Sequence, residues 1–308
     1  MLIQPGALPL QVLRYHLTKG SKTASELMYD VDVKTDGENA PMPTLVVDFE
    51  TMVEDVLGDG SAQLRITVVD ASVRDRSGSE PGDVMRSQAA ALRGVVIAET
   101  LAPDGNISGS RVESAGTSAK ASSQLDSLLR GLERMTMRLP AEPVGAGARW
   151  RERRTLPEGG IRATSEITYT LAARTGSTFT YTSTGQSTGA PQMIEQGGMK
   201  VEVTNTQGRS AAQGSVDLSR YVLEATATST FGTTMAIVTP DAGPGAARSI
   251  VEIAMAVRIT PAGAPSGAGS GEAAAAVPGD AATATDPAAP SSDAAARNPS
   301  DQGAHSAP

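Results

Sequence analysis

The two histidines of this sequence lack the neighbours that catalysis needs. His305 lies among small residues near the end of the chain, and His16 stands in an alternating stretch beside Arg14. A catalytic histidine needs a nucleophile to activate and a partner that orients its ring. His16 is therefore interpreted as a residue on the polar face of a strand.

The segment Gly185–Gly189 matches the G-x-S-x-G pattern of serine hydrolases, with Ser187 at the nucleophile position. That pattern requires a strand before the serine, a helix after it, and an acidic residue and then a histidine downstream. Here Ala190 and Pro191 follow at once, and His305 is the only later histidine. We predict a turn rich in Ser, Thr and Gly between two strands.

Two pairs of carboxylates have the i, i+2 spacing that places both members on one face of a strand: Asp30 with Asp32, and Asp48 with Glu50. Such pairs could hold Ca²⁺ or act in glycoside hydrolysis if two strands brought them together. No loop rich in Asp, Asn and Gly accompanies them, so the favoured interpretation is a solvated strand face with Lys34 and Arg65 nearby. A hydrolase that uses these carboxylates stays a minor alternative.

The amino-acid composition excludes several classes of site and partner. The chain has no cysteine, which excludes disulfides, thiolate metal sites and a cysteine nucleophile within it. It carries 26 basic and 34 acidic side chains, a net charge of −8, and no basic stripe that would neutralise phosphates. We predict no enzyme activity, no metal, no cofactor and no nucleic-acid partner. No apolar run reaches the roughly 18 residues that cross a bilayer, so we also predict no transmembrane segment.

Period-two alternation of apolar and polar residues dominates positions 10 to 260 and predicts half-buried strands. The clearest example places Val251, Ile253, Met255, Val257 and Ile259 on one face. Pro103-Asp104-Gly105-Asn106 predicts a hairpin turn. Ten or more strands with short turns favour antiparallel sheet, but spacing does not decide between one sheet and two.

One segment has helical spacing instead. Leu125, Leu128, Leu129, Leu132 and Met135 recur at intervals of three and four residues, behind a capping pattern at Ser123 and Asp126. We predict a helix near 123–138, which stops before Pro140 and packs its apolar face on the sheet. The fold class is therefore α+β, dominated by a long curved antiparallel sheet with one amphipathic helix.

The chain divides into three parts. Residues 1–9 form a short linker, 10–260 the sheet domain, and 261–308 a tail in which 38 of 48 residues are Ala, Pro, Gly, Ser or Thr. Such a tail cannot bury enough apolar surface to offset its ordering entropy and is expected to be disordered. We expect a periplasmic or cell-surface location if a signal segment precedes this sequence, and a cytoplasmic one otherwise.

The stretch Leu139–Trp150 resembles a signature, LP-x-x-P-V-x-x-G-x-x-W, of uncharacterised bacterial envelope proteins, many of them lipoproteins. In those proteins a helix ends at the motif and a second group of strands begins. The architecture is also loosely similar to periplasmic lipoprotein carriers and to lipid-carrying lipoproteins of the mycobacterial envelope. The resemblance implies a non-enzymatic envelope protein that binds a lipid or another hydrophobic molecule.

Aromatic residues make up only 3% of the chain, so the sheet either has a thin core or curves around a space that its own side chains do not fill. The first hypothesis is a binding module with an apolar ligand on the concave face; the alternative is a structural or interaction module tethered by its tail, with an unknown protein partner. The predicted pocket residues are Leu125, Leu128, Leu129, Leu132, Phe49, Trp150, Phe179 and Phe231.

Overall fold

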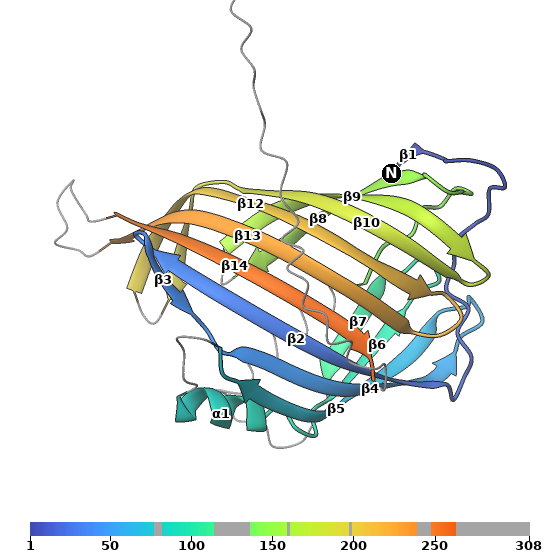
Figure 1. The fold of residues 1–308 in the computed structure, drawn as a ribbon, viewed down its shortest axis with the longest axis horizontal. Helices are drawn as coiled ribbons and strands as arrows, with labels where there is room; N and C mark the ends of the chain where they lie inside the picture. Colours follow the sequence, from blue (N-terminus) through green and yellow to red (C-terminus); the bar gives the residue numbers. More distant parts are fainter. Residues whose placement is uncertain (77–81, 114–135, 159–160, 197–198, 239–247, 263–308) are drawn as a thin grey trace, which may run out of the picture. The chain divides into compact units, whose positions relative to one another are not determined.

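The computed structural model describes residues 1–76, 82–113, 136–158, 161–196, 199–238 and 248–262 (Figure 1). All of them belong to one compact unit, Met1–Ala264. The predicted tail lies outside the described residues from position 263 onward. In the described part of the chain, no helix is long and apolar enough to cross a membrane.

Fourteen strands of the described residues form a single antiparallel sheet, so one sheet is correct and two sheets are not (Figure 1). The strands are β1 (Leu2–Gln4), β2 (Lys22–Thr35), β3 (Glu38–Pro41), β4 (Thr44–Val56), β5 (Ala62–Arg74), β6 (Val96–Leu101), β7 (Ile107–Val112), β8 (Arg149–Glu158), β9 (Ile161–Thr175), β10 (Thr178–Gly189), β11 (Gln192–Gln196), β12 (Met199–Asp217), β13 (Val222–Val238) and β14 (Arg248–Pro261). Their order is β1-β8-β9-β10-β12-β13-β14-β2-β4-β5-β6-β7, with β3 paired to β2 and β11 to β12.

The alternation predicted from the sequence is confirmed along the long strands. In β4, Val47, Phe49 and Val53 are buried, while Asp48 and Glu50 between them are partly exposed. Neighbouring residues of a strand point to opposite faces of the sheet, which explains this pattern. One face of the sheet is therefore apolar and the other is polar.

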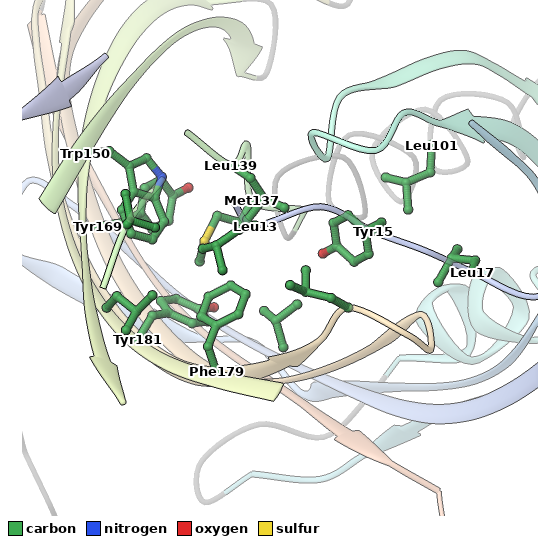
Figure 2. Close-up of a cluster of buried hydrophobic side chains, with 14 of the residues drawn as sticks. Leu13, Tyr15, Leu17, Leu101, Met137, Leu139, Trp150, Tyr169, Phe179 and Tyr181 are labelled. Carbon is green, nitrogen blue, oxygen red and sulfur yellow. The ribbon is translucent and has the colours of Figure 1, made fainter. Parts of the chain in front are cut away.

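The sheet curves until strands far apart in its order share a core cluster, which we call the filled end. Val53, Leu64 and Leu101 of β4–β6 meet Trp150 and Phe179 of β8–β10 there, although β12, β13, β14 and β2 separate the two groups. The filled end comprises Leu13, Tyr15, Leu17, Val53, Ala62, Leu64, Leu101, Met137, Leu139, Val144, Ala148, Trp150, Tyr169, Leu171, Phe179, Tyr181, Val216 and Leu218. Figure 2 shows side chains from the segment Leu13–Leu17 and from Met137 reaching into it.

The alternating stretch around His16, interpreted from the sequence as part of a strand, is not a strand. It is an extended chain that crosses the filled end, where the amide of Tyr15 donates to the carbonyl of Pro103 (2.8 Å) and that of His16 to the carbonyl of Leu218 (2.9 Å). Leu13, Tyr15 and Leu17 are buried. Alternation reports one-sided burial of an extended chain, and such burial does not require pairing in a sheet.

In the described part of the chain, a helix other than the predicted one packs on the sheet. Most of the predicted segment, 123–135, lies outside the described residues, and Thr136–Arg138 are described and are not helical. The helix of the described residues is α1 (Asp83–Ala90), which packs against β5 (Figure 1). Ala89 and, just after the helix, Leu92 are buried with Phe49, Ile66 and Val68 on the apolar face of the sheet.

Two predicted turns have opposite outcomes. The hairpin at Asp104-Gly105 is confirmed: it joins β6 to β7, Gly105 has a φ of 83°, and the Asp104 carboxylate accepts a hydrogen bond from the amide of Asn106 (3.0 Å). The turn predicted at Gly185–Gly189 is wrong, because these residues form the last part of β10. Their small side chains suit a paired strand as well as a turn, so composition could not separate the two.

Candidate ligand cavity

A cavity of about 500 Å³ lies on the apolar, inner face of the sheet. It is lined by residues of β2, β4, β5, β8, β9, β10, β12, β13 and β14, by α1, and by Met137 of the filled end. Sites for small molecules commonly measure about 300–1,000 Å³. The inner face therefore retains space of ligand size after its own side chains have packed.

The floor of the cavity consists of small residues aligned across three strands. Two neighbouring rows run from β10 through β12 to β13: Ser183–Ala212–Ala227 and Gly185–Ser210–Ser229. Residues directly opposite in an antiparallel pair project to the same face, so each row is continuous. Ser183, Ser210, Ala212, Ala227 and Ser229 all line the cavity.

The same rows become large and apolar at both sides of the floor. Ala227 pairs with Val257 of β14, which pairs with Tyr29 of β2, and on the other side Ser183 pairs with Tyr169 of β9. The next row continues to Met255 and Val31, and to Ile167. Small residues thus lie between two apolar walls, and the difference in side-chain size produces the hollow.

Apolar clusters close the cavity lengthwise. Met137, Tyr169 and Tyr181 belong to the filled end and also line the cavity. Further along the strands, Phe231 lines the cavity and packs with Ile161 and Val203 in a separate cluster. The small-residue floor is confined to the stretch between these two clusters.

A paired charge lies at the β8 side of the cavity. The Arg154 guanidinium donates from Nε to Glu152 Oε1 (2.6 Å) and from Nη2 to Glu152 Oε2 (2.8 Å) and to the carbonyl of Thr136 (2.5 Å). Tyr169 also donates to Glu152 Oε2 (3.3 Å). The Arg154 and Glu152 side chains are 15% and 9% exposed. This ion pair is therefore largely buried, and the charge of Arg154 is balanced beside the cavity it lines.

Tyr169 and Tyr181, which line the cavity, remain protonated at neutral pH. Burial raises the pKa of Tyr181 to about 12. Burial raises the pKa of Tyr169 as well, and the nearby Arg154 guanidinium opposes this shift only in part. Loss of water disfavours the charged phenolate, which explains both shifts. Each phenol therefore presents a neutral hydroxyl.

The structure separates the residues predicted from the sequence to line a pocket. Phe231 lines the cavity. Trp150 and Phe179 are 1% exposed and fill the core of the filled end, and Phe49 packs with α1. The four leucines of the predicted helix, Leu125, Leu128, Leu129 and Leu132, lie outside the described residues.

Other candidate residues of the sequence fall elsewhere. Asp30 and Asp32 face Arg76, whose guanidinium lies 3.9 Å and 3.1 Å from their carboxylates. His16 is exposed, and its Nδ1 lies 3.0 Å from the carbonyl of Arg14. Within the described residues, no group of three or more His, Asp or Glu could hold a metal ion. The candidate ligand site is therefore the cavity, whose small-residue floor the sequence did not predict.

Sequence reasoning missed the floor because it searched for large apolar residues. The missed residues are small: Ser183, Ser187, Ser210, Ala212, Ala225, Ala227 and Ser229. A signal was present in two short stretches, since Ser210, Ala212 and Gly214, and then Ala225, Ala227 and Ser229, stand at alternate strand positions where a core strand would carry Val, Ile or Leu.

Comparison with known proteins gives one partial family match and one weak structural similarity. Residues 94–220 match the model of a family described as "Family of unknown function (DUF6263)", which is less than half of the chain. No curated protein matches significantly. A solved structure titled "Lipid-protein interactions in lipovitellin" is similar with a TM-score of 0.46 and 10% identity, over 81% of this chain and 26% of that chain. The chain thus spans about a quarter of that protein, and none of these similarities assigns a function to it.

Proposed function

We propose that this protein binds a lipid-like molecule in the cavity on the inner face of its sheet. The observation that carries the proposal is the aligned floor of Ser, Ala and Gly between apolar walls, which leaves about 500 Å³ unfilled. A sheet that served only as a core would place large side chains in these rows, because interiors pack densely. The small residues make room for an apolar guest.

The walls supply the binding free energy. Leu27, Val31, Val257 and Ile259 line one side together with α1. Each methylene group that moves from water onto such a surface contributes about 0.8 kcal/mol. A ligand with an extended hydrocarbon chain gains most, because each of its methylene groups can lie against these apolar side chains.

The proposal is tested by a series of alkanols from octanol to tetradecanol, titrated against Nile red bound to the full chain. Each added methylene should tighten binding by about fourfold, the equivalent of about 0.8 kcal/mol. The gain should stop when the chain outgrows the cavity. An affinity that does not change with chain length, or no displacement of Nile red, would contradict lipid binding.

In this proposal the protein binds its ligand without chemical change. The charged pair beside the cavity is an arginine bonded to a glutamate, an arrangement that stabilises both charges and leaves no obvious base. A screen of ester and glycoside substrates across pH checks this point. Turnover that Asp30→Asn or Asp48→Asn abolishes would establish the hydrolase alternative instead.

We also propose a cell-envelope location. The resemblance of Leu139–Trp150 to envelope proteins supports it. Trp150, the last residue of this stretch, is buried near the start of β8. Fractionation of the source cells tests the location. Recovery in the periplasmic or membrane-associated fraction is expected, and recovery only with cytoplasmic proteins would contradict it.

A further inference from the structure

The two walls of the cavity differ in polarity. The wall on β2, β14 and α1 is mostly apolar, with Leu27, Val31 and Val257 on it. It also carries Gln88 and Tyr29, whose hydroxyl donates to Met255 Sδ (2.8 Å). The opposite wall is apolar at Ile167 and Tyr169, where it flanks the floor, and carries two hydroxyl groups in the next row along the strands: Ser165 of β9 and Ser187 of β10 line the cavity next to Arg154 of β8. Register places these three residues side by side, because Arg154 pairs with Ser165 and Ser165 pairs with Ser187.

The two serines form a hydrogen-bonded pair that can still donate. Their Oγ atoms are 2.6 Å apart, so one hydroxyl donates to the other. A hydroxyl has one donor and two acceptor lone pairs. The pair uses one of its two protons internally, which leaves one O–H and several lone pairs for a molecule in the cavity.

The neighbouring charges provide no net attraction for an ion. Both Glu152 oxygens accept hydrogen bonds from Arg154, and one also accepts from Tyr169. A carboxylate or ammonium group placed here would lose its hydration next to a pair that is already neutralised. Burial of an unpaired charge is costly, whereas a neutral hydroxyl or ester needs only a hydrogen-bond partner.

We infer that the ligand is an amphipathic lipid whose polar group is uncharged, such as an alcohol or an ester, and that this group lies against Ser165 and Ser187. Its hydrocarbon part then extends towards β14, β2 and α1. This inference rests on the proposed function and adds the chemical class and the orientation of the ligand.

Decanol, undecane and decanoate test the inference by displacement of Nile red from the full chain at pH 8. Undecane replaces the hydroxyl of decanol with a methyl group of similar size. In the Ser165→Ala/Ser187→Ala double variant, decanol should bind about fivefold more weakly, the usual effect of one lost hydrogen bond, while undecane should keep its affinity. Equal changes for both probes, or no change for decanol, would overturn the orientation.

The charge of the polar group has its own readout. Wild-type protein should bind decanoate at least tenfold more weakly than decanol. Glu152→Gln keeps the shape of the side chain and removes the negative partner of Arg154, so this variant should bind decanoate about tenfold more tightly than wild type does. Decanoate that binds wild type as tightly as decanol would overturn the uncharged group, even if Glu152→Gln fails to fold. Failure of all three probes to bind would instead overturn the proposed function itself.

Discussion

The filled end and the cavity lie on the same face of one sheet and differ in the size of their side chains. Five of the nine aromatic residues of the chain pack in the filled end, where Trp150 stacks on Tyr169 with ring centroids 5.5 Å apart. The neighbouring strands β12 and β13 instead present Ala212 and Ala227 to the cavity.

This difference shows that alternation alone does not specify a core. Period two fixes which face a residue is on, and side-chain volume then decides whether that face is filled. The low aromatic content predicted either a thin core or an unfilled space. Both descriptions hold locally, because the aromatic residues are concentrated at one end of the sheet.

The largest expected effect is the loss of the filled end at high pH. Tyr15, Tyr169 and Tyr181 are buried there, and burial raises the pKa of each, that of Tyr181 to about 12. Above pH ~10 the unfolded chain releases these protons and the folded chain does not, so each pH unit costs about 1.4 kcal/mol per phenol. The contribution of these buried phenols to the free energy of unfolding is therefore fully present below about pH 10, and it is lost as the pH rises towards about 12.

Circular dichroism and tyrosinate absorbance, followed together from neutral pH upward, check this prediction. Cooperative unfolding should coincide with ionisation of the tyrosines. Ionisation centred near the ordinary value of about 10, with the native spectrum intact, would show that these tyrosines are not buried.

Removal of the largest side chain of the filled end comes next. Trp150→Ala should lower the free energy of unfolding by about 3–5 kcal/mol, since it leaves a cavity in a packed core. It also deprives the carbonyl of Arg138 of the indole N–H that donates to it (2.9 Å). Urea unfolding followed by circular dichroism measures the loss, and a change below about 1 kcal/mol would contradict tight packing.

Addition of volume to the filled end should also destabilise. Ala148 is fully buried there. Ala148→Leu should lower the free energy of unfolding by about 1–3 kcal/mol, because the added methylenes find no space. The same urea titration measures it, and an unchanged midpoint would show that the filled end has room.

The smallest effect on stability is expected for the same exchange on the cavity floor. Ala227→Leu places its methylenes in open space, so the free energy of unfolding should change by less than about 1 kcal/mol. The comparison with Ala148→Leu is direct, since both variants add the same atoms. A loss at Ala227 as large as that at Ala148 would show that the cavity is already filled.

The sequence predicted what depends on neighbouring residues. The face of Met255, Val257 and Ile259, the hairpin at Gly105 and the burial of Trp150 all follow from local spacing. The helix α1 was missed because its eight residues carry few apolar positions, too few for a helical period to stand out.

The cavity depends on pairing between distant segments and could not be predicted in this way. Ala227 of β13 pairs with Val257 of β14, and Val257 pairs with Tyr29 of β2, which lies near the other end of the domain in sequence. Only strand order and register place these residues in one row. Of the predicted pocket residues described here, Phe231 lies at the cavity, whereas Trp150 and Phe179 took the ordinary role of large apolar residues, which is to fill a core.

Nile red binding to Ala227→Phe and Ala256→Phe is the most direct measurement of the central claim. Ala227 lines the cavity, while Ala256 lies on the neighbouring strand β14 and, by alternation between Met255 and Val257, points to the outer face. Ala227→Phe should abolish binding and keep the fold, and Ala256→Phe should bind like wild type. Equal binding by both variants would show that the ligand does not occupy this cavity.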